Sequence, residues 1–126
     1  MELPLAYRWL KAHNFEGFTP WYLIDPLSEL AAGLRKEYQL ETGKDLLPFA
    51  RRQDNDDIAG FEVIDNLAKP KVITVHLTWI GKREAPGFPR TAESTDMLAW
   101  LSEIVLPETQ DWMDERELAD LISQRG

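Results

Sequence analysis

The stretch that decides the fold is PFARRQDNDDIAGFEVI, residues 48–64. Two arginines lead into a short run of acid and amide residues, and an apolar run follows. Within residues 58–64 every second side chain shares one face, which is the period of a β-strand. That face carries Ala59, Phe61 and Val63. We therefore expect residues 58–64 to form a half-buried strand, and residues 46–53, where the period of two begins, to form a further strand across a turn at the acidic run.

A second alternating run, KVITVHLTWI, occupies residues 71–80. One face holds Ile73, Val75, Leu77 and Trp79. His76 lies on the opposite face, which we expect to be exposed to solvent and polar. The connection NLAKP, residues 66–70, is too short for a crossover, so the two strands should pair antiparallel. The sequence therefore predicts an antiparallel sheet of at least three central strands.

Helical periodicity precedes the sheet. Apolar residues recur at intervals of three and four in residues 6–13, where Pro4 can occupy the first turn. The same period appears in residues 27–38, and Asp25 followed by proline is expected to cap this second helix. Residues 17–26 are predicted to be an irregular or extended link.

Helical periodicity also follows the sheet. A stripe of apolar residues in residues 97–105 predicts a helix capped by Ser94 and stopped by Pro107. In the acidic C-terminal segment, residues 107–126, a short amphipathic helix is marked by Leu118, Leu121 and Ile122. We therefore expect an α+β fold, with residues 1–126 forming a single domain in which helices pack against the sheet.

Composition restricts the function. The chain has no cysteine, which excludes disulfides, thiolate metal sites and cysteine nucleophiles. It has 22 acidic and 14 basic residues, for a formal net charge of −8, so its average field repels nucleic acid and attracts a basic protein. No apolar run is long enough for a membrane span, and no secretory signal is visible. We expect a cytoplasmic protein that binds neither nucleic acid nor membrane.

The acidic run invites a calcium interpretation, because carboxylate oxygens bind hard cations. The ligand spacing argues against it. A calcium loop starting at Asp54 needs an oxygen ligand at its fifth position and glycine at its sixth, where this chain has Ile58 and Ala59. Its twelfth position is Asp65 rather than glutamate. We predict a turn, with neither metal nor cofactor.

Catalysis finds little support in the sequence. His76 has no nucleophile motif around it, and we predict no catalytic residues. A carboxylate pair chosen from Asp56, Asp57 and Glu62, with tryptophans to stack on sugar, stays open as a remote alternative. However, the tryptophans at positions 9, 79 and 100 are expected in the core.

Five basic residues would gather if the end of the first central strand met the long loop of residues 81–90. They are Arg51, Arg52, Lys82, Arg83 and Arg90. An anion site is one interpretation of such a cluster. We favour the other interpretation, in which these residues form a solvated rim or pair with nearby acids.

The central half of the chain resembles the SUKH superfamily, which is named partly for yeast regulators of cell-wall assembly. The resemblance covers residues 46–106 and rests on an ordered set of segments. These are Pro48 to Ala50, the acidic turn Asp54 to Asp57, the strand Ile58 to Val63, the strand Val72 to Trp79, and the helix Ser94 to Trp100. Residues 17–26 lack the family's early pattern, so the fold of the N-terminal third is not assigned by this resemblance.

The resemblance implies an α+β fold without enzymatic activity. Many bacterial members look like immunity proteins, which bind and neutralise toxins that are often nucleases. We therefore predict an immunity-type inhibitor of a basic toxin, with an intracellular regulatory or scaffold domain as the alternative and a carboxylate-dependent hydrolase as the remote one. The sequence leaves a homo-oligomer open. The candidate partner-binding residues are Asp54, Asp56, Asp57, His76 and Phe88, the last held between Gly87 and Pro89 on the long loop.

Overall fold

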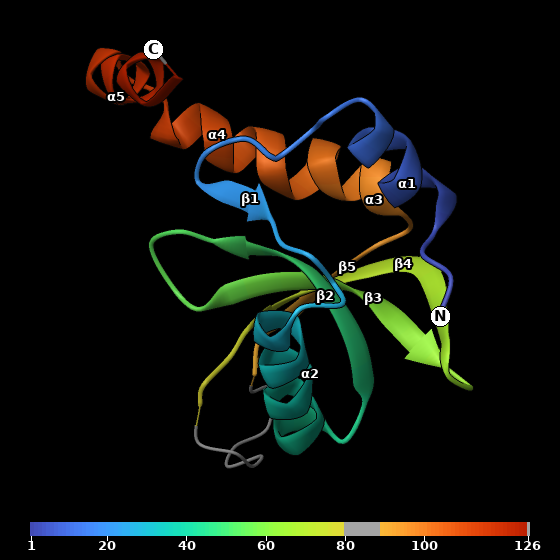
Figure 1. Cartoon of the computed structure of the whole chain (residues 1–126). Coiled ribbons are helices and arrows are strands. Elements are labelled where there is room, and N and C mark those ends of the chain that lie inside the picture. The colour runs from blue at the N-terminus through green and yellow to red at the C-terminus, as the bar shows by residue number, and fades with distance from the viewer. Residues whose placement is uncertain (80–88, 126) are drawn as a thin grey trace.

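The computed structural model describes residues 1–79 and 89–125 and contains a five-stranded antiparallel sheet between two layers of helices (Figure 1). The strands follow one another in chain order across the sheet. They are β1 (Trp21–Leu23), β2 (Asp45–Arg52), β3 (Asp57–Ile64), β4 (Leu67–His76) and β5 (Thr91–Ser94). The predicted α+β class and the antiparallel central strands are confirmed, and two edge strands, β1 and β5, are added to them.

The helices divide between the two faces of the sheet (Figure 1). They are α1 (Leu5–Ala12), α2 (Glu29–Thr42), α3 (Met97–Trp100), the π-helical segment η1 (Leu101–Val105), α4 (Leu106–Trp112) and α5 (Glu115–Arg125). Helix α2 covers one face, whereas α1 and the continuous helix α3–η1–α4 cover the other. Helix α5 lies beyond the end of α4, away from the sheet. None of the helices within residues 1–79 and 89–125 is long and apolar enough to cross a membrane.

The central strands β2 and β3 are buried on both faces, so the prediction that residues 58–64 form a half-buried strand is wrong. Ile58 packs with α2 on one face, and its neighbour Ala59 packs under the other helical layer. On the opposite face, Ile58 and Gly60 are not polar, and Glu62 is the one polar residue before the strand ends at Ile64. Such a run is typical of a strand covered on both sides, so an exposed polar face is confined to the ends of the strands.

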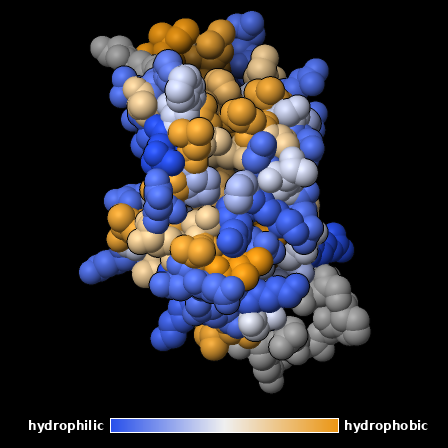
Figure 2. Space-filling model, turned by 90° about the vertical axis from the view of Figure 1, so that its right-hand side faces the viewer, coloured by the Kyte–Doolittle hydropathy of each residue, from blue (hydrophilic) through white to orange (hydrophobic). Residues whose placement is uncertain are grey.

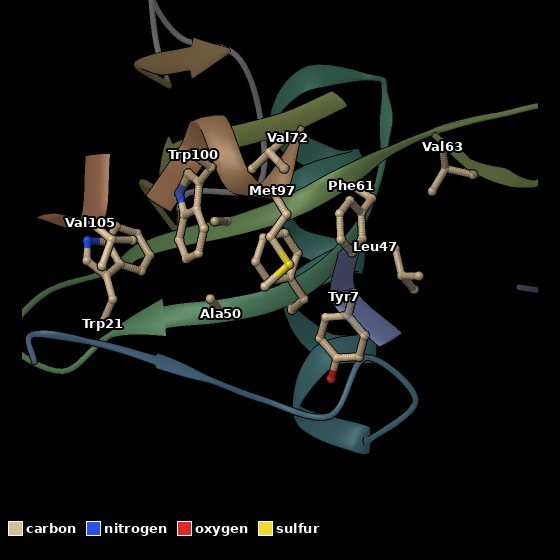
Figure 3. Close-up of a cluster of buried hydrophobic side chains, with 12 residues drawn as sticks. Tyr7, Trp21, Leu47, Ala50, Phe61, Val63, Val72, Met97, Trp100 and Val105 are labelled. Carbon is tan, nitrogen blue, oxygen red and sulfur yellow. The ribbon is translucent and has the colours of Figure 1, made fainter. Parts of the chain in front are cut away.

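The larger core cluster is aromatic (Figure 3). Phe49 stacks on Phe61 with 4.4 Å between ring centroids, and the edge of Trp100 meets Phe49 at 5.0 Å. Trp21 meets Trp100 at 5.5 Å, although Trp21 belongs to the segment that was predicted to be a link. The core therefore ties β1 and α3 to the central strands.

Two of the three tryptophans predicted in the core are exposed. Trp9 is 63% exposed because α1 directs Tyr7 toward the sheet instead. Trp79 is 49% exposed because β4 ends at His76, and the alternation of faces ends with it. The backbone of Trp79 is also left-handed, with φ of 62°.

The turn between β3 and β4 is shorter than predicted. Asp65 and Asn66 both have positive φ, 52° and 62°, which is the conformation of a two-residue hairpin turn. Aspartate and asparagine tolerate this region better than other side chains. Residues 67–70, which were predicted to be part of the connection, therefore belong to β4.

Both predicted helix caps shift along the chain. Ser28 rather than Asp25 caps α2, where its hydroxyl accepts a hydrogen bond from Ala31 N at 3.2 Å. Asp96 rather than Ser94 caps α3, because Ser94 is the last residue of β5. In both cases two residues were able to cap, and the neighbouring structure selects one of them.

Pro107 does not stop the helix that contains it, which contradicts the prediction. The helix passes through η1 into α4 and continues to Trp112. In the wider π turn, Leu106 N donates to Leu101 O, five residues back. A π bulge changes the hydrogen-bonding register, and this accommodates a residue that has no N–H and whose ring clashes in a regular α-helix.

Candidate partner-binding site

The acidic run forms the connection between β2 and β3, as predicted. Asp54 and Asp56 are exposed, and Asp57 begins β3 half-buried. Asn55 stabilises the turn because its side-chain oxygen accepts a hydrogen bond from Asp57 N at 2.8 Å. Phe88, the remaining loop candidate, lies outside the described residues.

Asp57 and His76 meet across adjacent strands. They are paired residues of β3 and β4, and His76 Nδ1 lies 2.7 Å from Asp57 Oδ1. The imidazole side chain is 52% exposed, whereas the carboxylate side chain is 23% exposed. The pair lines a groove of about 590 Å³ between the sheet and the helix above it, where Thr74, Ile104 and Glu108 also contribute. The structure thus brings two of the predicted site residues together.

Arg52 connects this turn to α4. Its guanidinium donates to Asp54 Oδ1 at 2.6 Å and also to Glu108 Oε1. The same oxygen of Glu108 accepts a hydrogen bond from Trp21 Nε1 at 2.9 Å. The hydrogen bond with Asp54, together with the attraction of Glu108, raises the pKa of Arg52. The guanidinium also lies 5.9 Å from the ring centroid of Trp112, within cation–π range.

This network shows which of the basic and acidic residues singled out in the sequence form ion pairs. Arg52 is paired with acids, as we favoured, and the charge of Asp54 is therefore partly compensated. Lys82 and Arg83 lie outside the described residues. Sequence analysis missed Glu108, because 56 residues separate it from Arg52 and no local pattern signals the contact.

A buried carboxylate, that of Glu41, holds the residues that follow the end of β4. Glu41 of α2 has no exposed surface, and it accepts hydrogen bonds from Thr78 N at 2.8 Å, Thr78 Oγ1 at 2.7 Å and Trp79 N at 3.0 Å. Burial by itself raises the pKa of Glu41, but hydrogen bonds from Glu37, Thr78 and Trp79 outweigh burial and lower it. The carboxylate thereby holds the residues that follow His76.

The chemistry of the groove is limited by its geometry. Thr74 has the nearest hydroxyl on the strand that carries His76, two positions earlier and on the same face. That spacing is roughly 6–7 Å along a strand, which exceeds hydrogen-bond reach. Asp57 and Glu62 line different grooves on opposite faces of the sheet, so these two carboxylates do not form a pair. Within residues 1–79 and 89–125, no group of three or more histidines and acids is placed to hold a metal ion.

Comparison of the chain with protein-family models, curated proteins and solved structures finds no match. The resemblance to the SUKH superfamily therefore stays a prediction from the sequence. The fold itself defines a class, an open antiparallel α+β sheet with helices on both faces.

Proposed function

We propose that this chain is a non-enzymatic protein-binding domain of the immunity type, which neutralises a basic toxin by binding it at the end of the sheet where β3 begins and β4 ends. The observation that carries this proposal is the grouping of Asp56, Asp57 and His76 at the end of the sheet where β3 begins and β4 ends. Asp56 projects from the turn, and the oriented pair of Asp57 and His76 lies beside it.

Charge supplies the first stage of binding in this proposal. A net charge of −8 attracts a basic partner over distances of about 8 Å at physiological salt. His76 supplies a donor or acceptor that Asp57 holds in place, so it suits short-range recognition after the encounter. Acidic side chains accordingly affect the association rate, and groups buried on binding affect the dissociation rate.

The test uses the toxin domain encoded by the reading frame next to the gene for this chain. Cells that express the toxin domain should die, and cells that also express this chain should grow. Purified proteins should bind, and Asp56→Asn combined with Asp57→Asn should slow association at low salt. Glu29→Gln, at the start of α2 on the other face, is the matched control and should leave association close to that of the parent. Absence of both rescue and binding would remove the proposal.

A further inference from the structure

A second surface lies at the junction of α4 and α5, in the segment where the sequence predicted an acidic amphipathic helix. A groove of about 670 Å³ runs between these helices and the loop before β1. Its apolar lining residues are Phe18, Trp112, Met113, Leu118 and Leu121. We call this surface the α4–α5 groove. Met113 is 70% exposed and Leu118 is 49% exposed, so the apolar lining is open to solvent.

The apolar surface continues along α5. Leu118, Leu121 and Ile122 follow the helical spacing of three and four residues, and all three are exposed. Figure 2 shows apolar surface at the top of the molecule, at the height of α5 in Figure 1. An apolar stripe on a helix normally packs against another element of the protein. On α5 the stripe is exposed, so it is available to contact a helix of a partner.

Carboxylates line part of this apolar surface. Asp114, Glu115 and Glu117 line the groove itself. Residues 106–125 contain six acids and two arginines, the acids being Glu108, Asp111, Asp114, Glu115, Glu117 and Asp120. An apolar floor with an acidic rim is complementary to a segment that has an apolar face and basic flanks.

We propose that the α4–α5 groove binds a basic amphipathic helix of the protein partner. A helix presents apolar side chains at intervals of three and four residues, which matches the stripe on α5, and its lysines and arginines would face the acidic rim. A second copy of this chain carries the same acidic rim, so like charges oppose its docking here. The same repulsion opposes an anionic lipid surface. The inference rests on the proposed function for the presence of a protein partner, but it assigns a different surface.

The experiment uses a defined probe, a fluorescein-labelled peptide of leucine and lysine about 18 residues long, long enough to form a helix on the groove. Its leucines follow the spacing of three and four residues. One control peptide has the same composition with the leucines scrambled, and a second carries glutamate in place of lysine. Fluorescence anisotropy should give saturable binding of the first peptide to the whole chain and at least about tenfold weaker binding of both controls.

Variants locate the bound peptide. Leu118→Gln combined with Leu121→Gln should weaken binding about tenfold or more, and circular dichroism should show an intact fold because both side chains are exposed. Glu115→Gln combined with Glu117→Gln should weaken binding and reduce its dependence on salt. Leu27→Gln, at an exposed leucine just before α2, is the matched control and should bind like the parent. In an NMR titration the indole N–H signal of Trp112 should shift.

The outcomes separate the two proposals. Equal binding of the ordered and scrambled peptides, or unchanged binding by the two-leucine variant, would overturn the groove assignment. If the ordered peptide binds at the groove but the chain neither binds nor neutralises the toxin, the proposed function falls and the groove assignment stands. If toxin neutralisation succeeds and is the same in the two-leucine variant, with no binding of the peptide, the groove assignment falls and the proposed function stands.

Discussion

Replacement of Glu41 by glutamine tests whether this buried carboxylate holds the end of β4 in place. The substitution keeps the shape of the side chain but removes its charge. One oxygen remains as an acceptor, and an N–H₂ group takes the place of the other. Since Thr78 and Trp79 together direct three donors at the carboxylate, at least one donor would then face another donor.

The magnitude follows from these contacts. A buried donor left without an acceptor costs about 1–3 kcal/mol, and hydrogen bonds to a charged group are worth about 1.5–3 kcal/mol each. We therefore expect Glu41→Gln to lower the free energy of unfolding by about 2–4 kcal/mol at neutral pH. This is a large part of the roughly 5–15 kcal/mol that stabilises a typical domain.

The effect should depend on pH in a defined direction. The pKa of Glu41 in the folded protein is lowered from its ordinary value of 4.5. The carboxylate therefore contributes stability that is fully present above pH 4.5 and is lost as the pH falls through the folded-state pKa. Below that pKa the parent carries a neutral side chain as well, so the difference between parent and variant should shrink.

Urea unfolding of both proteins at neutral pH and at about pH 3.5 measures this difference, because the other carboxylates are common to both and cancel. Glu37→Gln, one helical turn earlier, is the matched control. Glutamine keeps a hydrogen-bonding side chain beside Glu41, so its effect should stay within about 1 kcal/mol. A loss below about 0.5 kcal/mol for Glu41→Gln, or an equal loss at both pH values, would refute the reasoning.

Three further predictions follow from the fold and the acidic turn. Phe61→Ala should lower the free energy of unfolding in urea by about 3–5 kcal/mol because its ring is fully buried, whereas Trp79→Ala should lower it by about 1 kcal/mol because half of the side chain is exposed. Equal losses would contradict the difference in burial between the two side chains. Calcium or magnesium should leave the melting temperature unchanged, since residues 53–56 form the connection between two strands. A rise of several degrees in a thermal scan would mean that the native state binds metal. Asp45→Asn should cost about 1–2 kcal/mol at neutral pH, because it breaks the paired hydrogen bonds with Arg35. The hydrogen bond with Arg35 lowers the pKa of Asp45 from its ordinary 3.8. The loss of unfolding free energy in Asp45→Asn should therefore diminish as the pH falls below that value. If urea unfolding shows that the loss persists in acid, the charge of Asp45 is not its source.

Elements with a local signal were predictable. The strand β3 and its antiparallel pairing with β4 depend on side chains within a few positions of one another, whereas the turn between them, at Asp65 and Asn66, was predicted too far along the chain, at residues 66–70. The acidic run could likewise be identified as a turn, because Asn55 acts on the backbone two residues ahead. Where two residues were able to serve as a helix cap, local preference did not decide between them, and the surrounding structure selected Ser28 and Asp96.

The candidate site was predictable only in part. Asp57 and His76 were proposed separately, and strand pairing brings them within 2.7 Å. Trp21, Arg52 and Glu108 were not proposed together, because the hydrogen bond between Trp21 and Glu108 spans 87 residues of sequence. No residue pattern within one segment records a contact of this length.

The sequence by itself determined the charge of this protein, its antiparallel central strands and the acidic turn between two of them. Each depends on composition or on preferences among near neighbours, which act before the chain is packed. Only the tertiary structure decided that helices cover both faces of the sheet, that Trp9 and Trp79 face solvent while Trp21 is buried, and that α4 continues through Pro107. These features arise when distant elements compete to bury apolar surface, and the outcome depends on the shape of the whole core.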